Sequence, residues 1–246
     1  MQESNNNTQA APASSLGLSI AVIIAAVIIG GAVVYTNKNN PNPATPNDVA
    51  ARPSVEQQKA DAKNISPVTE EDHIRGSINA PIKIVEYSDM ECPFCIRLHA
   101  TLAQIVKEYP NDVAWVYRHM PLKQLHKKAI TEAIASECVA DLKGEEAFWS
   151  YIDTMDANAP GNDRMDLSLL STYAVALGVD KTAFDTCLTD AKSFDAIQAT
   201  IAEGFAAGAQ GTPFSVVITP KGEYIPVAGA QPIEVWRQIM DQIKTQ

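Results

Sequence analysis

The stretch IVEYSDMECPFC, residues 84–95, contains two of the chain's four cysteines, separated by Pro93 and Phe94. It continues an apolar run of strand type that begins after Pro81. Beyond the second cysteine, apolar side chains recur at helical spacing until Pro110 ends the pattern. The sequence therefore predicts a strand over residues 82–87, a turn that carries the cysteine pair, and then a helix.

The pair Cys92 and Cys95 stands at the start of that helix. Pro93 suits the first helical position, because the N–H group that it lacks has no helical partner there. The Cys92 thiol then faces unpaired backbone N–H groups and the positive end of the helix dipole, which stabilise a thiolate, the nucleophilic form. Cys95 lies one turn further along the same face, within disulfide reach. The pair alone is also compatible with half of a metal site or with an inert disulfide.

Glu86 lies in the predicted strand, six residues before Cys92. Side chains alternate along a strand, so Glu86 shares a face with Ile82 and Ile84. A carboxylate on an apolar face is costly to bury, and we expect it beneath the helix that carries the cysteines. We predict that its pKa is raised and that it accepts the proton of Cys95 when that sulfur attacks. The alternative is a carboxylate that faces solvent at the end of the strand.

The remaining pattern predicts an α/β domain. A second strand completes a βαβ unit, helices follow, and two strands and a helix close the chain. The last strand contains Pro226, which favours an edge position in the sheet. In order, we predict a strand at 113–117, helices at 122–142, 145–155, 167–177, 181–188 and 194–207, strands at 214–219 and 223–229, and a helix at 233–243.

Residues 68–243 resemble the thioredoxin superfamily, and more narrowly the DsbA-type thiol–disulfide oxidoreductases of bacterial envelopes. The resemblance rests on the CPFC motif, the acid six residues before it and the Gly-Thr-Pro loop late in the chain. It implies a thioredoxin fold with inserted helices at about residues 122–208. It also implies that Cys92 is the exposed nucleophile, Cys95 the resolving thiol and Glu86 the buried acid.

The same resemblance implies a substrate site opposite the cysteines. Pro213 matches the cis-proline of the family, and an X–Pro bond adopts the cis form at a cost of only about 0.5–1 kcal/mol. A cis turn would direct the backbone of Thr212 at the dithiol, where it can pair with an extended substrate peptide. We count Phe94, between the cysteines, with Thr212 and Pro213 as substrate-binding residues.

Two features argue against a very strong oxidant. Some relatives have a histidine between the cysteines, whose positive ring would stabilise the thiolate, and here Phe94 carries no charge. Asp89 and Glu91 lie just before Cys92, and nearby like charge raises the pKa of a thiol.

Cys138 and Cys187 lie on apolar stripes of two predicted helices in the inserted region. We predict a structural disulfide, which could contribute on the order of 4 kcal/mol to stability. The alternative is two buried free thiols, which behave as small hydrophobic side chains. A structural disulfide requires an oxidising compartment, and this places the domain outside the cytoplasm.

The N-terminal part predicts a membrane anchor. Residues 16–35 carry no charge, and 20 residues of helix span roughly the 30 Å hydrocarbon core of a bilayer. A cleaved signal peptide is the alternative, but the leader lacks Lys and Arg and no good cleavage site follows. Lys38 weakly favours a cytoplasmic domain, in conflict with the cysteines. We therefore expect a disordered segment at 1–15, a transmembrane helix at 16–35, a Pro- and Asn-rich linker at 36–64 and the folded domain at 65–246.

The composition excludes some classes of function. The net charge is −10 and no basic stripe occurs, which argues against nucleic-acid binding. The histidines and the second cysteine pair lack the spacing of a zinc site, so we predict no metal site and no cofactor. His99 is expected on a solvated helix face.

Together these patterns predict a single-pass protein of the cell inner or cytoplasmic membrane, with its domain in the periplasm or extracytoplasmic space. We expect it to form or exchange disulfides in proteins with free thiols, and to be re-oxidised by a membrane partner. An isomerase or reductase of the same fold is the first alternative, decided by the reduction potential. A non-enzymatic tethered metal or assembly chaperone is the second, and it would form no mixed disulfides.

Overall fold

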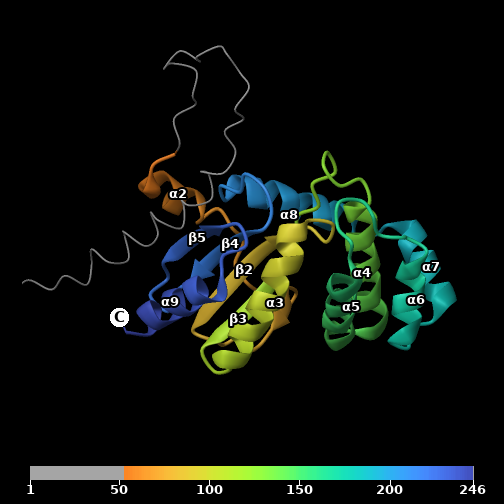
Figure 1. Cartoon of the computed structure of the whole chain (residues 1–246), viewed down its shortest axis with the longest axis horizontal. Coiled ribbons are helices and arrows are strands. Elements are labelled where there is room, and N and C mark those ends of the chain that lie inside the picture. Colours follow the sequence, from red (N-terminus) through yellow and green to blue (C-terminus); the bar gives the residue numbers. More distant parts are fainter. Residues whose placement is uncertain (1–52, 246) are drawn as a thin grey trace, which may run out of the picture.

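A five-stranded mixed sheet with the order β1-β3-β2-β4-β5 is the centre of the computed structural model, which describes residues 53–245 (Figure 1). Strands β2 (Ile82–Ser88) and β3 (Val113–His119) are parallel, and the other pairs are antiparallel. The predicted α/β thioredoxin-type arrangement is confirmed, with β4 (Phe214–Ile218) beside β2 and β5 (Tyr224–Ala228) at the edge. Sequence analysis did not predict β1 (His73–Arg75), because three half-buried residues show no periodicity.

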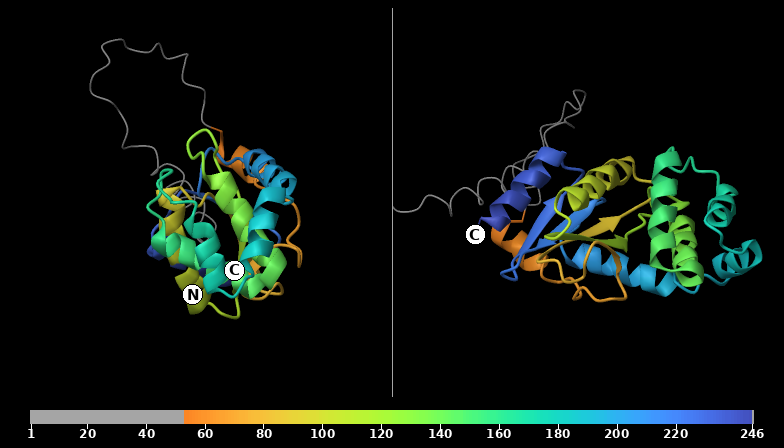
Figure 2. Two further views of the ribbon diagram at one scale, coloured as in Figure 1. Left: turned by 90° about the vertical axis from the view of Figure 1, so that its right-hand side faces the viewer. Right: turned by 90° about the horizontal axis from the view of Figure 1, so that it is seen from below.

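Helices cover both faces of the sheet. Helices α3 (Pro93–Glu108) and α9 (Ile233–Lys244) lie on one face, and α8 (Phe194–Ala206) lies on the other (Figure 2). Strand β2 is buried on both sides, because Ile82 and Ile84 pack in the core beneath α3 while Val85 and Tyr87 pack in the core beneath α8. The alternation predicted for this strand therefore directs Glu86 toward α3.

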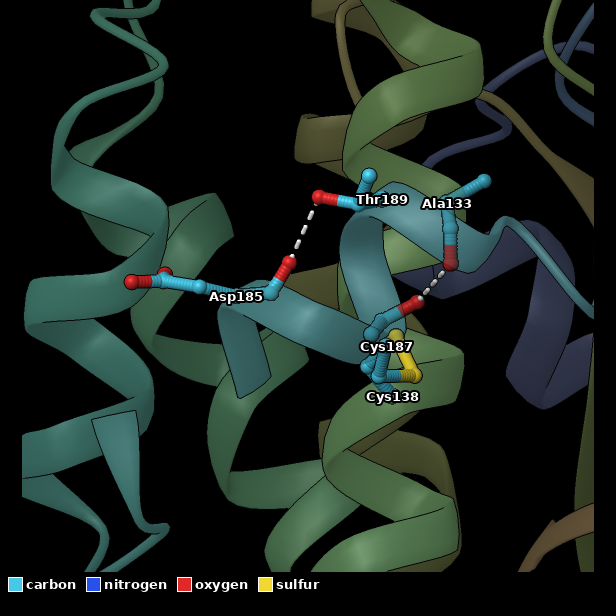
Figure 3. Close-up of a disulfide and its surroundings, with 6 residues drawn as sticks. Ala133, Cys138, Asp185, Cys187 and Thr189 are labelled. Atoms are coloured by element: carbon cyan, nitrogen blue, oxygen red, sulfur yellow. Dashed lines mark hydrogen bonds between the residues drawn. A yellow bond between two sulfur atoms is a disulfide. The ribbon is translucent and has the colours of Figure 1, made fainter. Parts of the chain in front are cut away.

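The inserted helices form a separate bundle beyond the end of the sheet (Figure 1). They are α4 (Ala129–Lys143), α5 (Glu145–Asn158), α6 (Leu169–Ala176) and α7 (Lys181–Asp190), which precede α8. Cys138 on α4 and Cys187 on α7 form a disulfide, which joins the inner and outer helices of this bundle (Figure 3).

Helix α4 begins at Ala129, not at residue 122 as we predicted. The segment between forms a loop, because the buried carboxylate of Asp89 accepts hydrogen bonds from the backbone N–H of Leu122 and from the ring of His126. A tertiary contact from the cysteine turn therefore overrides the helical pattern of this segment.

The first residues that the structure describes include a helix. Helix α2 (Val55–Asp61) falls in the segment that we assigned to the linker, and Ser54 caps its N-terminus. Ala62 is buried in the core beneath α8, and the Asn64 side chain donates to the Ala206 carbonyl, so packed structure begins before residue 65. The predicted disordered segment at 1–15, the membrane span at 16–35 and the linker up to residue 52 lie outside the described residues. Within residues 53–245, no helix has the length and apolar character of a membrane span.

Candidate active site

The cysteine motif lies where β2 passes into α3. Strand β2 ends at Ser88, and Cys92 is the N-cap residue of α3, with Pro93 in the first turn as predicted. The backbone N–H of Cys92 donates to the Asp89 carbonyl, 3.0 Å away, which closes the turn. Cys92 and Cys95 both carry free thiols. The Cys92 side chain is only 6% exposed, less than we expected for an attacking sulfur.

The environment of Cys92 favours a thiolate. A hydrogen bond from the Cys95 thiol, and others from the backbone N–H groups of Cys95 and Phe94, lower the pKa of Cys92 to about 6 against the opposing effect of burial. As a thiol, Cys92 donates to the Thr212 carbonyl, 3.4 Å away. The buried Thr212 hydroxyl has no other hydrogen-bond partner and is placed to donate to the sulfur once it is ionised.

Cys95 has the opposite environment. Its sulfur is buried, and the nearest backbone donor is the Asp89 N–H, 3.4 Å away. Burial, followed by the Cys92 sulfur and the Glu86 carboxylate, raises the pKa of Cys95 well above its usual value. Near neutral pH the motif therefore holds one ionised and one protonated sulfur.

Glu86 is fully buried on the α3 side of β2. Its carboxyl oxygens accept hydrogen bonds from the Ser88 hydroxyl and the Trp115 indole N–H, each 2.9 Å away. Burial raises the pKa of Glu86 to about 7, although the positive charge of His99 and these hydrogen bonds oppose the rise. A carboxyl group with this pKa can both take and return a proton near neutral pH.

Thr212 and Pro213 complete the site from the loop before β4. Their peptide bond is cis, and the Thr212 carbonyl lies at the Cys92 sulfur. The two residues also border a cleft of ≈560 Å3. Side chains of α2, the end of α8 and strand β5 form its other walls, including Gln58, Phe205 and Pro226.

Phe94 projects from the first turn of α3 and is 54% exposed. Its ring contacts the guanidinium of Arg97, 5.1 Å from the ring centre, rather than the protein core. The ring is thus exposed between the two cysteines, and its contact with a substrate stays a prediction.

The acids before Cys92 do not act as the sequence suggested. Asp89 is buried and its carboxylate pairs with the His126 ring, 2.9 Å away. Glu91 is buried near Glu132, and burial and the Glu91 carboxylate raise the pKa of Glu132 to about 9. Neither acid is among the main influences on the pKa of Cys92, which is lowered overall by its hydrogen bonds.

His99 was also placed wrongly. It is buried on the α3 face that covers Glu86, between Asp153 and Asp156 of α5. The signal was present in the sequence, because His99 follows Cys95 by four residues and must share its helix face. The side chains of Asp89, His126, Glu132 and the two aspartates could not be assigned to the site, since only the tertiary fold brings them there.

Comparison with known proteins agrees with this geometry. A family profile described as "Thioredoxin" matches residues 68–241, which is most of the chain. The chain belongs to the thioredoxin family. Among solved structures, this family member is similar to DsbA2 of Pseudomonas aeruginosa, with 26% identity and a TM-score of 0.60 over 72% of this chain and 96% of that one. It is also similar to α-DsbA1 of Wolbachia pipientis, with 21% identity and a TM-score of 0.62 over 75% and 96% of the two chains. The thioredoxin fold of this chain is therefore DsbA-like.

This thioredoxin-family chain also matches part of a curated relative that is named as a transport protein. It is a Na(+)/H(+) antiporter, NhaA 1, of Mycolicibacterium gilvum, which is 38% identical over 116 residues. The match covers 47% of this chain but only 18% of that protein. The shared part is thus a small portion of the relative.

Proposed function

We propose that the protein is a thiol–disulfide oxidoreductase that forms or exchanges disulfides in other proteins through Cys92 and Cys95. The observation that carries this proposal is the inequality of the two sulfurs. Cys92 has a lowered pKa and lies at the N-terminus of α3 beside Thr212, whereas Cys95 has a raised pKa and is buried in the helix. A dithiol with one ionised and one protonated sulfur suits sequential exchange through a mixed disulfide.

The oxidised pair accepts two electrons in two steps. A substrate thiolate attacks the Cys92 sulfur, the Cys92–Cys95 bond breaks, and Cys95 leaves as a thiolate. Because that thiolate is buried, it takes a proton from the Glu86 carboxyl group. The second substrate thiolate then attacks the substrate sulfur of the mixed disulfide, and Cys92 leaves as its stable thiolate. The substrate gains a disulfide, and the enzyme keeps two electrons and a proton on its dithiol.

The cleft supports a polypeptide substrate. Thr212 and Pro213 border the cleft. The exposed ring of Phe94 adds an aromatic surface next to Cys92 in the motif, and together these features suit an extended chain that carries a cysteine. The Thr212 carbonyl lies at the Cys92 sulfur, so a substrate strand that pairs with the Thr212 backbone can be held beside the sulfur during attack.

The proposed location is outside the cytoplasm, attached to a membrane by residues 16–35. The Cys138–Cys187 disulfide supports an oxidising compartment. A relative named as an antiporter supports a membrane-attached setting for such a domain, since an antiporter works across a membrane. In this setting the reduced Cys92–Cys95 pair would pass its electrons to a membrane oxidant.

The test is to trap the mixed disulfide. In Cys95→Ala the Cys92 thiolate can still attack a disulfide of a client protein, which is the reverse of the second step. No Cys95 thiol is then present to break the mixed disulfide, so covalent adducts should accumulate on Cys92 in cells. Non-reducing gels and mass spectrometry would show adducts that a reductant removes. The matched control is Cys92→Ala, which should give none.

A protein that uses its cysteines as ligands or as a staple would give no adducts in either variant. Absence of adducts from Cys95→Ala, in protein whose Cys92 still reacts with a thiol reagent, would overturn the proposed function.

A further inference from the structure

A buried cluster of charged groups lies beneath α3, next to the dithiol. Cys95 and His99 are one helical turn apart on the buried face of α3. Glu86 and Trp115, on neighbouring strands β2 and β3, lie under this face. The Trp115 indole lies between Glu86 and His99. Its N–H donates to Glu86 at 2.9 Å, and its ring meets the His99 ring edge-on, with 4.8 Å between the ring centres.

His99 is held between two carboxylates of α5. Its Nε2 lies 2.6 Å from Asp153, and its Nδ1 lies 3.0 Å from Asp156 without the alignment of a hydrogen bond. Asp153 also pairs with Arg75 of β1, 2.8 Å away. Burial lowers the pKa of His99, but the carboxylates at its two ring nitrogens outweigh this and raise the pKa, which favours the imidazolium form.

The charge of His99 matters because Glu86 forms no salt bridge with any group in residues 53–245. Burial alone would keep this carboxyl group protonated, and a protonated acid cannot accept the proton of Cys95. Among the groups that lower the pKa of Glu86, the charge of His99 has the largest effect.

We propose that His99 is a positioning residue for the dithiol reaction, an imidazolium clamped by Asp153 and Asp156 that keeps Glu86 able to exchange protons with Cys95. The inference rests on the proposed function and adds to it the group that tunes the buried acid. Without the ring charge, Glu86 would hold its proton to higher pH, and activation of the Cys95 sulfur at neutral pH would be slower.

Other charged or titratable groups face this cluster from each surrounding element. They are Cys95 on α3, Arg75 on β1, Glu86 on β2, Tyr117 on β3, and Asp153 and Asp156 on α5. Tyr117 stays neutral, since burial raises its pKa well above the usual value. Burial also raises the pKa of Asp156 to about 6. Its carboxyl group therefore becomes protonated, and loses its charge, as the pH falls through about 6.

The experiment distinguishes the reaction of Cys92 from that of Cys95 by their different rates. The full-length chain, with Cys92 and Cys95 reduced, is mixed with the aromatic disulfide dithionitrobenzoate. Attack by Cys92 releases one coloured thiolate in a fast phase. Attack by Cys95 on the resulting mixed disulfide releases the second in a slower phase that requires Cys95 to lose its proton. Each phase is followed by stopped-flow absorbance as a function of pH.

In His99→Gln, the midpoint of the second phase should move upward by about one pH unit or more, and its rate at pH 7 should fall by about fivefold. The first phase should keep its wild-type midpoint. His99→Lys restores a positive charge between the aspartates and should return the midpoint toward the wild-type value. Asp153→Asn, at a half-exposed position, should shift it in the same direction as His99→Gln but by less.

His73 supplies the matched control. It too is an imidazolium between two carboxylates, Glu137 and Glu145, which raise its pKa to about 9 against burial, but it stacks on Phe148 and does not contact Glu86. His73→Gln should leave both midpoints unchanged, even if it destabilises the fold by a similar amount.

The proposal is overturned if the second midpoint of His99→Gln and Asp153→Asn equals that of the wild type, or if His73→Gln moves it equally. Failure of the proposed function looks different, because Cys92 would then show no fast phase near neutral pH and Cys95→Ala would trap no substrate.

Discussion

The buried carboxyl group of Glu86 lowers the stability of the folded protein once it is ionised. It is fully buried in an apolar strand, and its pKa rises from 4.5 to about 7 in the folded protein. The unfolded chain therefore releases this proton at lower pH than the native protein does. The contribution of Glu86 to stability is lost as the pH rises from 4.5 to about 7, and the full cost, roughly 3 kcal/mol, applies above that range.

Glu86→Gln should therefore stabilise the reduced protein at pH 8 by roughly 1–3 kcal/mol, because the amide keeps an acceptor for Trp115 and has no charge to bury. Near pH 4.5 most of the advantage should vanish, since the carboxyl group is then protonated in the folded wild type and half protonated in the unfolded chain. Urea denaturation at the two pH values measures this difference. Equal stability of the two proteins at pH 8 would show that the carboxyl group is not buried as described.

The helical bundle contributes to stability, whereas β2, α3 and the loop before β4 hold the reactive cysteines. The disulfide between α4 and α7 closes a loop with a sequence separation of 49, and it lies in the helical bundle rather than beside the reactive cysteines. Its effect is expected on stability and not on chemistry, since Cys92 and Cys95 are held by β2, α3 and the loop before β4.

Replacing both partners, Cys138→Ala and Cys187→Ala, should lower the free energy of unfolding by about 2–4 kcal/mol, the range expected for a closed loop of this size. The reaction of Cys92 with a thiol reagent should keep its wild-type rate and pH midpoint. Urea melts and the reagent kinetics check the two parts separately. A changed midpoint would mean that the bundle does influence the active sulfur.

At the scale of the whole molecule, sequence patterns predicted the elements of the fold because their signals are local. The apolar periodicities at 82–87 and 93–108, the proline after Cys92 and the Pro226 edge strand required no tertiary information. The predicted boundaries failed where a distant side chain decided the backbone, as Asp89 does for residues 122–128. His99 was misplaced for the related reason that its partners come from a helix more than 50 residues away.

The N-terminal anchor is a prediction for the whole chain. Deletion of residues 16–35 should move the protein from the membrane fraction to the soluble fraction, because it removes the apolar run of 20 residues. Deletion of residues 1–15 is the control and should leave the protein in the membrane. Fractionation followed by immunoblotting measures both. Persistence of the shorter protein in the membrane after a carbonate wash would exclude residues 16–35 as the anchor.

The Asp89 carboxylate has a consequence for how such proteins can diversify. One anion holds both the turn before Cys92 and the loop before α4, through Leu122 and His126. Between these anchors, Lys123, Gln124 and Leu125 are exposed. Mutation can therefore alter the exposed surface of this loop over generations while the turn that holds Cys92 keeps its hydrogen bonds.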